Sequence, residues 1–397
     1  MARLIQKSGY FKGGSGVGYM RYVAQREGVE ITSDTGLVTE KQRQLIENLL
    51  KDYPDTKELF EYEDYLTTPN RATASAYIAA ALDSHLHEME PESGYMKYIA
   101  QRPRAEKHGG HGLFSAASAT DLDEAVAELD AHKGRVWTFI FSLRREDAVQ
   151  TGYNNAEAWR TLLLQQSGTL AEALRIPQDK LRWYAAFHDE GHHPHVHMMV
   201  WSDDPRMGHL TKKGIFAMRS KLTGTIFREE LKDVYIRKEE IYKRSIQTAQ
   251  EKLLDLTAQM EQRTCPDTEI ELLMRELSQQ LSQLSGKHQY GYLPKPVKAT
   301  VDTIVDRLAQ LPEVAACYAQ WNQVKDELVR FHNQNPRRHL PLSQQKEFRV
   351  LLNAVIRESE RIRLTEEAVV KTAEQAPLPP PVVVEQPRDM TTAQNIS

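Results

Sequence analysis

Cysteine is nearly absent from this sequence, since only Cys265 and Cys317 occur among its 397 residues. Two scattered cysteines cannot build a disulfide framework or a thiolate zinc site, so any bound metal must take other ligands. A long apolar run is also missing, as is the charged-then-apolar start of a signal segment. We therefore expect no membrane span and a cytoplasmic protein.

No strong charge of either sign marks the chain as a whole. The net charge is −4 and the pI is near 6.4, which argues weakly against a nucleic-acid partner. A local excess nevertheless lies between Arg206 and Arg244, where eleven lysines and arginines stand against five acids. Because charge runs are more often solvated helix faces than binding sites, this segment alone leaves both interpretations open.

Histidine, by contrast, is concentrated in one place. Five of the fourteen histidines fall within residues 188–197, between apolar flanks. His195 and His197 are two residues apart in a predicted strand, so their side chains should project from the same face. A hairpin across residues 190–194 would bring His188 back beside this pair. The pattern therefore predicts three imidazoles that converge on one side of a sheet.

Three imidazoles on a sheet can hold a divalent metal ion and leave positions open for a substrate. We expect the adjacent acids Asp189 and Glu190 to orient the ring N–H groups. A lone histidine on a strand is usually a surface or core residue, but the H-x-H alternation favours a metal site here. His192 and His193 fall in the predicted turn and receive no ligand role.

The remaining pattern indicates an α/β or α+β fold. Residues 3–11 and 135–142 are typical of strands, the second being rich in β-branched and aromatic residues and expected in the centre of the sheet. Helical periodicity occupies residues 36–90, with an acidic stretch at 52–64 expected on the surface, and returns at 156–174. Strands alternate with helices and end in an antiparallel hairpin.

From Glu239 onward the sequence pattern is almost wholly helical. Its apolar residues at 270–284 repeat at three- and four-residue intervals for little more than two heptads, so a helical hairpin is expected rather than a long coiled coil. A second helical unit is predicted at 297–373. The proline-rich segment 375–397 is expected to be disordered or extended.

A nine-residue motif occurs twice in the N-terminal part. Residues 18–26 read GYMRYVAQR and residues 94–102 read GYMKYIAQR, with seven identities and two conservative changes. Each copy places an arginine four residues after its second tyrosine, one turn along a helix. The motif can be a duplicated packing module with half-buried tyrosines, or it can supply a nucleophilic tyrosine.

The histidine pattern and the tyrosine motif together resemble the HUH relaxases of conjugative and mobilisable elements, specifically the MobP class. The resemblance covers roughly residues 1–240. His188 matches the first metal ligand of that family, and Pro194 to His197 match its Pro-His-x-His pair. The segment from Lys12 to Val29 is similar to the one that carries the family's tyrosine behind the first strand.

This resemblance implies a fold and an activity. The fold would be an antiparallel-sheet HUH endonuclease core with flanking helices, followed by an all-helical region. The activity would be nicking of one DNA strand at an origin of transfer, through a 5′-phosphotyrosyl intermediate. His188, His195 and His197 would hold Mg²⁺ or Mn²⁺, and the partners would be single-stranded origin DNA, accessory relaxosome proteins and a coupling protein.

The identity of the nucleophile stays open between Tyr22 and Tyr98. Tyr22 follows the first strand and a glycine-rich turn, as the family's nucleophile does, whereas Tyr98 lies at a more usual interval before the histidines. An insertion between the two copies, at residues 31–93, would explain both observations. We rank Tyr22 ahead of Tyr98, with Tyr19 and Tyr95 as further candidates.

The resemblance also favours a DNA-binding function for the basic segment, with Lys212, Lys213, Arg219 and Lys221 as expected contacts. The expected organisation is a relaxase domain at 1–240, a helical accessory domain at 241–374 and the tail. Two alternatives remain. The chain can be a metal-dependent phosphodiesterase that uses activated water and no tyrosine, or a non-catalytic DNA-binding accessory protein.

Overall fold

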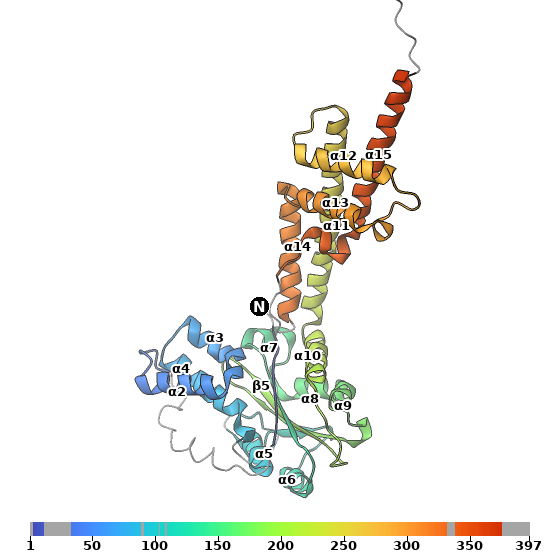
Figure 1. Cartoon of the computed structure of the whole chain (residues 1–397). Helices are drawn as coiled ribbons and strands as arrows, with labels where there is room; N and C mark the ends of the chain where they lie inside the picture. The colour runs from blue at the N-terminus through green and yellow to red at the C-terminus, as the bar shows by residue number, and fades with distance from the viewer. Residues whose placement is uncertain are drawn as a thin grey trace, which may run out of the picture. The chain divides into compact units, whose positions relative to one another are not determined.

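The computed structural model divides into two compact units. The first comprises the described residues of Met1–Lys238 and Gln323–Arg337, and the second those of Glu239–Asn322 and Arg338–Ser397. Figure 1 shows the whole chain, coloured from the N-terminus to the C-terminus. The residues described are 3–11, 33–88, 91–102, 104–107, 109–331 and 338–374.

The first unit contains a five-stranded sheet in which every neighbouring pair is antiparallel. The α+β fold expected from the sequence is therefore confirmed. The order across the sheet is β1 (Ile5–Tyr10), β3 (Trp137–Ser142), β5 (His195–Ser202), β4 (Leu181–His188) and β2 (Leu113–Ser115). Strand β3 is an interior strand, as expected, but β5 is the central one and pairs with both β3 and β4.

Both faces of the sheet are covered, which explains why β3 and β5 are apolar almost throughout. On one face, the rings of Phe139 and Phe141 stack on each other, and Trp159 of α8 (Ala156–Gln165) stacks on Phe141. The predicted helix at 156–174 is two helices, α8 and α9 (Ser167–Leu174), because the chain bends at Gln166 before the poor helix former Gly168.

The opposite face of the sheet packs against α5 (Glu92–Gln101) and α6 (Leu122–Ala131). Tyr95 and Ile99 of α5 share a buried cluster with Met199 and Trp201 of β5. The second copy of the repeated motif is thus the helix that covers the histidine-bearing face. The first copy, at 18–26, lies outside the described residues.

The segment between the two motif copies is helical where it is described, and it has its own small core. Side-chain caps at Thr39 and Asn70 begin two of its helices, each with a capping box. Ile46 and Tyr77 are among the residues of its core. Its elements are α2 (Glu40–Asp52), η1 (Pro54–Glu58), α3 (Phe60–Thr67), α4 (Arg71–Ser84) and η2 (Leu86–Glu88).

The acidic stretch at 52–64 is not simply a surface feature, which corrects the expectation from the sequence. Lys7, on β1, is only 8% exposed. Its Nζ lies 3.1 Å from the carboxylate of Asp55. Asp55 also contacts His85 at 3.2 Å. A buried lysine needs such partners, so this contact fastens the helical segment to the first strand.

The remaining helices of the first unit follow the sheet strands. They are α7 (Arg145–Thr151), α10 (Lys212–Ile226) and the beginning of α11 (Arg228–Glu261). Helix α10 begins at a side-chain cap from Thr211, and its buried residues include Met218 and Leu222. No helix in the described part of the chain is both long and apolar enough to cross a membrane.

The second unit is all-helical, as expected. Ile270, Leu277 and Leu281 of α12 (Thr268–Ser282) are fully buried in one core with residues of its neighbours, so the predicted apolar repeat marks a packed face. The proline-rich tail at 375–397 lies outside the described residues. The unit contains most of α11, then α12 (Thr268–Ser282), α13 (Lys295–Leu308), the first half of α14 (Pro312–Phe331) and α15 (Arg349–Glu374).

The contact between Asp55 and Lys7 predicts an acid-dependent stability term. The hydrogen bond from His85 and the charge of Lys7 hold the pKa of Asp55 well below its ordinary value. Its contribution to the free energy of unfolding is therefore complete above pH 4 and declines at lower pH, disappearing only when the pH falls through the lowered pKa of the folded protein. We expect Asp55→Asn to cost about 1–2 kcal/mol at pH 7, a figure discounted because the carboxylate is half exposed, and markedly less at pH 2. Calorimetry of both proteins at the two pH values measures this, and an equal loss at both would contradict it.

Candidate metal centre

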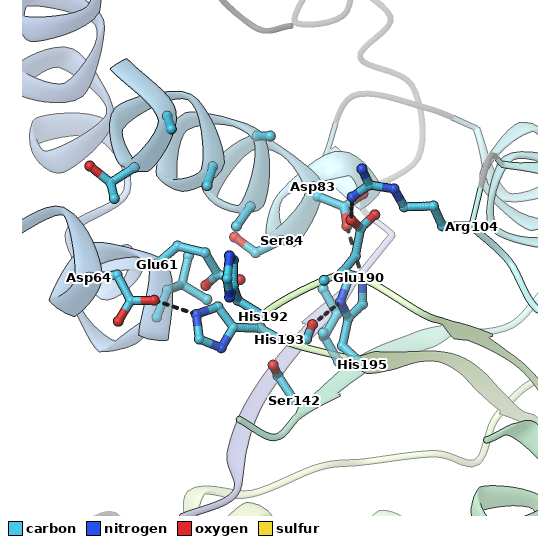
Figure 2. Close-up of a pocket in the computed structure, with 18 of the residues that line it drawn as sticks. Glu61, Asp64, Asp83, Ser84, Arg104, Ser142, Glu190, His192, His193 and His195 are labelled. Carbon is cyan, nitrogen blue, oxygen red and sulfur yellow. Dashed lines mark hydrogen bonds and ion pairs between the residues drawn. The ribbon is translucent and has the colours of Figure 1, made fainter. Parts of the chain in front are cut away.

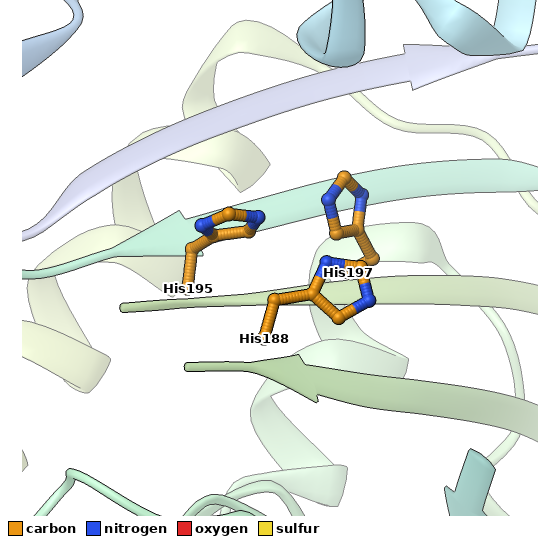
Figure 3. A group of neighbouring side chains, drawn as sticks. All are labelled: His188, His195 and His197. Atoms are coloured by element: carbon orange, nitrogen blue, oxygen red, sulfur yellow. The ribbon is translucent and has the colours of Figure 1, made fainter. Parts of the chain in front are cut away.

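Three histidines meet on the α5 side of the sheet, as the sequence predicts. His188 ends β4 and pairs directly with His195, which begins β5, while His197 lies two residues further along β5. The ring centroids are 5.2 Å apart for His188 and His195, 4.7 Å for His188 and His197, and 5.0 Å for His195 and His197. Figure 3 shows the three rings turned toward one another.

The donor atoms of this triad fit a metal ion. One nitrogen of each ring lies within 4.8 Å of the others. His188 donates Nε2–H to the carbonyl of Ile99 at 2.9 Å, and His195 donates Nδ1–H to the carbonyl of His193 at 3.1 Å. The remaining nitrogens, Nδ1 of His188 and Nε2 of His195, are buried without a hydrogen-bond partner among the described residues. Such unpaired buried acceptors are costly unless a ligand satisfies them.

Helix α5 sets the orientation of two of the three rings. Besides the Ile99 carbonyl that holds His188, the hydroxyl of Tyr95 forms a 2.9 Å hydrogen bond with Nδ1 of His197. Tyr95 and Ile99 are four residues apart, so both lie on the same side of the helix. Metal-binding imidazoles commonly have their second nitrogen fixed in this way.

Asp83, at the end of α4, faces the triad from the helical segment. Its Oδ2 lies 3.0 Å from Nε2 of His197 and 3.6 Å from Nε2 of His195, and it also accepts a 2.7 Å hydrogen bond from Arg102. Its other oxygen, Oδ1, is buried without a hydrogen-bond partner in the described part of the chain. Asp83 therefore brings a carboxylate to the space between the imidazoles.

The charge states suit a cation site. Burial, together with the neighbouring rings, lowers the pKa of His188 well below its usual value, and burial also lowers the pKa of His197. Both rings are therefore neutral at pH 7 and can act as ligands. Burial alone would raise the pKa of Asp83, but the charge of Arg102 and the hydrogen bond from His197 outweigh it and hold that pKa well below the ordinary range. Asp83 is consequently an anion.

The described structure therefore brings together neutral imidazoles and an anionic carboxylate on a rigid sheet, beside a nine-residue motif that occurs twice. A family model for MobL relaxases matches residues 1–377 of this chain. The chain belongs to the MobL relaxase family. It is thus a relaxase, an enzyme that acts on DNA by nicking it. No curated protein and no solved structure matches the chain.

The two acids expected to orient the histidine rings of the relaxase contact arginines instead. Asp189 accepts a 2.5 Å hydrogen bond from Arg145, and Glu190 pairs with Arg102 at 3.1 Å and with Arg104. The orienting groups are the carbonyls of Ile99 and His193, the Tyr95 hydroxyl and Asp83. The sequence signal placed the acids next to the histidines in the chain, but the β4–β5 connection turns them away from the rings.

His193, to which no ligand role was given, nevertheless supports the triad of the relaxase. Its side chain is 5% exposed, stacks on Phe60 at 5.2 Å and donates Nε2–H to Asp64 of α3 at 2.7 Å. Its carbonyl accepts the Nδ1–H of His195. Asp64 therefore fixes the short connection that precedes His195, one of the candidate metal ligands.

The tyrosine candidates of the relaxase separate into three groups. Tyr22 and Tyr19 lie outside the described residues. Tyr95 is 1% exposed, and burial and the charge of Asp83 raise its pKa well above its usual value, so it is poorly suited to be a nucleophile. Tyr98 is 39% exposed, and the guanidinium of Arg102, which also binds Asp83, lies 5.6 Å from its ring centroid. Tyr98 thus reaches the candidate metal centre through one intervening side chain, that of Arg102.

The expected DNA contacts of the relaxase lie on α10. Lys212, Lys213 and Lys221 are exposed and have no ion pair among the described residues. Other cations of the same segment are paired, including Arg206 with Asp204 at 3.0 Å and Lys232 with Glu229 at 3.6 Å. Arg219 is half-buried, and burial lowers its pKa. The lysines of α10 are therefore among the available cations of this segment.

Sequence reasoning missed Asp83, Arg102 and Tyr95 as supports of the triad. Arg102 and Tyr95 carried a signal, because both are identical in the two copies of the repeated motif. Asp83 carried none, since a single aspartate at the end of a helix is an ordinary surface residue.

We expect Tyr95→Phe to weaken Mn²⁺ binding by roughly tenfold, because it removes the hydroxyl that fixes the His197 ring. Tyr98→Phe, one turn later on the same helix, is the matched control and should bind Mn²⁺ as the parent does. His197→Ala should abolish binding. Isothermal titration with MnCl₂ measures all three, and normal Mn²⁺ affinity in Tyr95→Phe would show that the hydroxyl does not support the site.

Proposed function

We propose that this relaxase nicks one DNA strand at an origin of transfer by metal-assisted tyrosine transesterification, as an HUH-type enzyme of the MobP class. The observation that carries the proposal is the triad itself, in which two buried ring nitrogens have no hydrogen-bond partner within the described ranges and Asp83 lies beside them. The product would be a 5′-phosphotyrosyl adduct for mobilisation of a plasmid or integrative element.

The residues that would hold a divalent ion are His188, His195 and His197, with the Asp83 carboxylate beside them. When bound, Mg²⁺ or Mn²⁺ would polarise the scissile phosphate and offset the charge that develops there. Imidazole ligands by their intrinsic affinity favour the later transition metals, so Mn²⁺ is the better probe of the two. Tyr95, Ile99 and His193 would keep the rings oriented.

In the proposed reaction the tyrosine oxygen attacks the phosphorus, and the bond from phosphorus to the 3′ oxygen breaks. The tyrosine hydroxyl gives up its proton and the departing 3′ oxygen gains one, so a 3′-hydroxyl is released. A phosphodiester is exchanged for another phosphodiester, which allows the reverse reaction to reseal the strand. A tyrosine pKa near 10 makes the hydroxyl a weak nucleophile at neutral pH, so a nearby cation must assist its ionisation.

Tyr22 is the first candidate for this nucleophile and Tyr98 the second. In favour of Tyr98, the guanidinium of Arg102 contacts both its ring and Asp83. Against it, the buried hydroxyl of Tyr95 binds His197, which indicates that the second motif copy supports the metal centre. The first copy is then the better source of the nucleophile. Tyr22 therefore remains ahead.

We expect Tyr22→Phe to abolish the covalent adduct and Tyr98→Phe to retain it. The protein is incubated with Mn²⁺ and single-stranded DNA from the transfer origin of its own element, and the adduct is detected on a denaturing gel. Loss of the adduct in Tyr98→Phe alone would reverse the assignment. Free cleaved ends without adduct in the parent would indicate a phosphodiesterase that uses water, and intact DNA would indicate a binding protein.

The exposed lysines of α10 support single-stranded DNA as the partner of the proposed relaxase domain at 1–240. We expect the triple variant Lys212→Ala, Lys213→Ala, Lys221→Ala to bind DNA more weakly and to lower the slope of log affinity against log salt by about 2, or about 0.7 per lost phosphate contact. Fluorescence anisotropy over a salt series measures the slope. The double variant Arg206→Ala, Lys232→Ala removes paired cations and is the control; an equal effect there would contradict a specific surface.

Accessory relaxosome proteins and a coupling protein are the further proposed partners. The helical domain proposed at 241–374 would bind them. A buried apolar core within this range supports the proposal of a packed helical domain.

A further inference from the structure

A cavity of about 580 Å³ opens beside the histidine triad. It is lined by residues of α3, α4 and the β4–β5 connection, as Figure 2 shows. Asp83 and His195 belong both to this lining and to the candidate metal centre. A DNA strand whose scissile phosphate lies at the triad would therefore have a neighbouring nucleotide at the mouth of the cavity.

One wall of the cavity is apolar and made of small side chains. Ala72, Ala76, Ala79 and Ala80 recur at helical spacing on α4, so their methyl groups share one face, and Leu59 adds to the same lining. Small side chains leave room for a flat ring and give it apolar contact. Single-stranded nucleic acids are recognised in this way, with an unstacked base held against protein and hydrogen-bonded on its edge.

The other distinctive feature of the cavity is the carboxylate of Glu61 on α3. Figure 2 shows Glu61 and Asp64 on one side of the cavity and Asp83, Arg104 and Glu190 on the other. Asp64 has both oxygens engaged, by Arg144 at 3.1 Å and by His193 at 2.7 Å.

Glu61, in contrast, is half-buried, and among the residues that the structure describes its carboxylate has no hydrogen bond or ion pair with another side chain, only a hydrogen bond with its own backbone N–H. Burial raises the pKa of Glu61, as expected for a carboxyl group that is partly withdrawn from water and has few partners. A ligand that donates hydrogen bonds to Glu61 would remove this cost, whereas one that presents only acceptors would increase it.

We propose that this cavity binds a guanine base of the DNA substrate, next to the scissile phosphate, and that Glu61 selects it. The proposal rests on the proposed DNA-nicking function. The α4 alanines would contact the face of the base, and the two oxygens of Glu61 would accept hydrogen bonds from its pairing edge.

The choice of guanine follows from the pattern of donors and acceptors on the four bases. Guanine alone presents two adjacent donors, N1–H and the 2-amino group, on the edge that is free in a single strand. Adenine and cytosine place a ring acceptor beside their amino donor, and thymine places its one donor between two carbonyl oxygens. A carboxylate would face a lone pair in each of these three cases, so they are disfavoured.

The first test uses a pool of single-stranded oligonucleotides in which the nucleotides flanking the nick are randomised. Adducts formed with Mn²⁺ are purified and sequenced. We expect a preference for guanine at one flanking position in the parent, lost or shifted toward adenine in Glu61→Gln, because an amide offers one acceptor and one donor. Glu47→Gln, an exposed carboxylate on α2, is the matched control and should keep the parent profile.

The second test measures binding by fluorescence anisotropy and needs no cleavage, so it examines the cavity even if the nicking chemistry fails. Each guanine of the single-stranded origin DNA is replaced in turn by hypoxanthine, which removes only the 2-amino donor. We expect about tenfold weaker binding to the parent, the size of one specific base contact, and no change for Glu61→Gln. Identical base profiles and identical hypoxanthine effects in the parent and Glu61→Gln would overturn the proposal. Absence of adducts alone would instead count against the nicking function.

Discussion

The candidate site depends on the register between β4 and β5. His188 lies directly opposite His195, so the end of one strand and the beginning of the next place their side chains on the same face. A shift of one residue would turn His188 to the other face and separate it from His197. The register is fixed by burial, because Phe187 and Val196 on the opposite face are also paired and fully buried. The core on one side of the sheet thus holds the imidazoles on the other.

Helix α5 shows how a repeated sequence can carry a structural function. Its copy of the motif gives a carbonyl to His188, a hydroxyl to His197 and a guanidinium to Asp83. Two groups of the helix and one from its C-cap residue, Arg102, therefore determine the orientation of two rings and the charge of the carboxylate beside them. The tyrosine that looks most like a buried aromatic in this copy, Tyr95, is a polar partner of the site.

The helical segment between the motif copies is also part of the site. It was expected as an insertion with an acidic surface, yet its acids contact the sheet. Asp55 pairs with Lys7, Asp64 holds His193, and Asp83 reaches the triad. Each acid meets a cation or an imidazole that is largely buried, which is the arrangement that makes a buried charge tolerable. The cavity that Glu61 lines exists because this segment packs there.

The sequence by itself determined strands β1 and β3, the β4–β5 hairpin, the α+β class and the convergence of His188, His195 and His197, but not the short strand β2. These follow from local periodicity, which acts over a few residues. Only the tertiary structure decided the partners of the triad, since Tyr95 is 102 residues from His197 and Asp83 is 114 residues from it in the chain. Contacts over such separations depend on how helices pack on the sheet, and no local pattern records that packing. For the same reason Asp189 and Glu190, next to the histidines in the chain, contact arginines, while Asp83 reaches the rings.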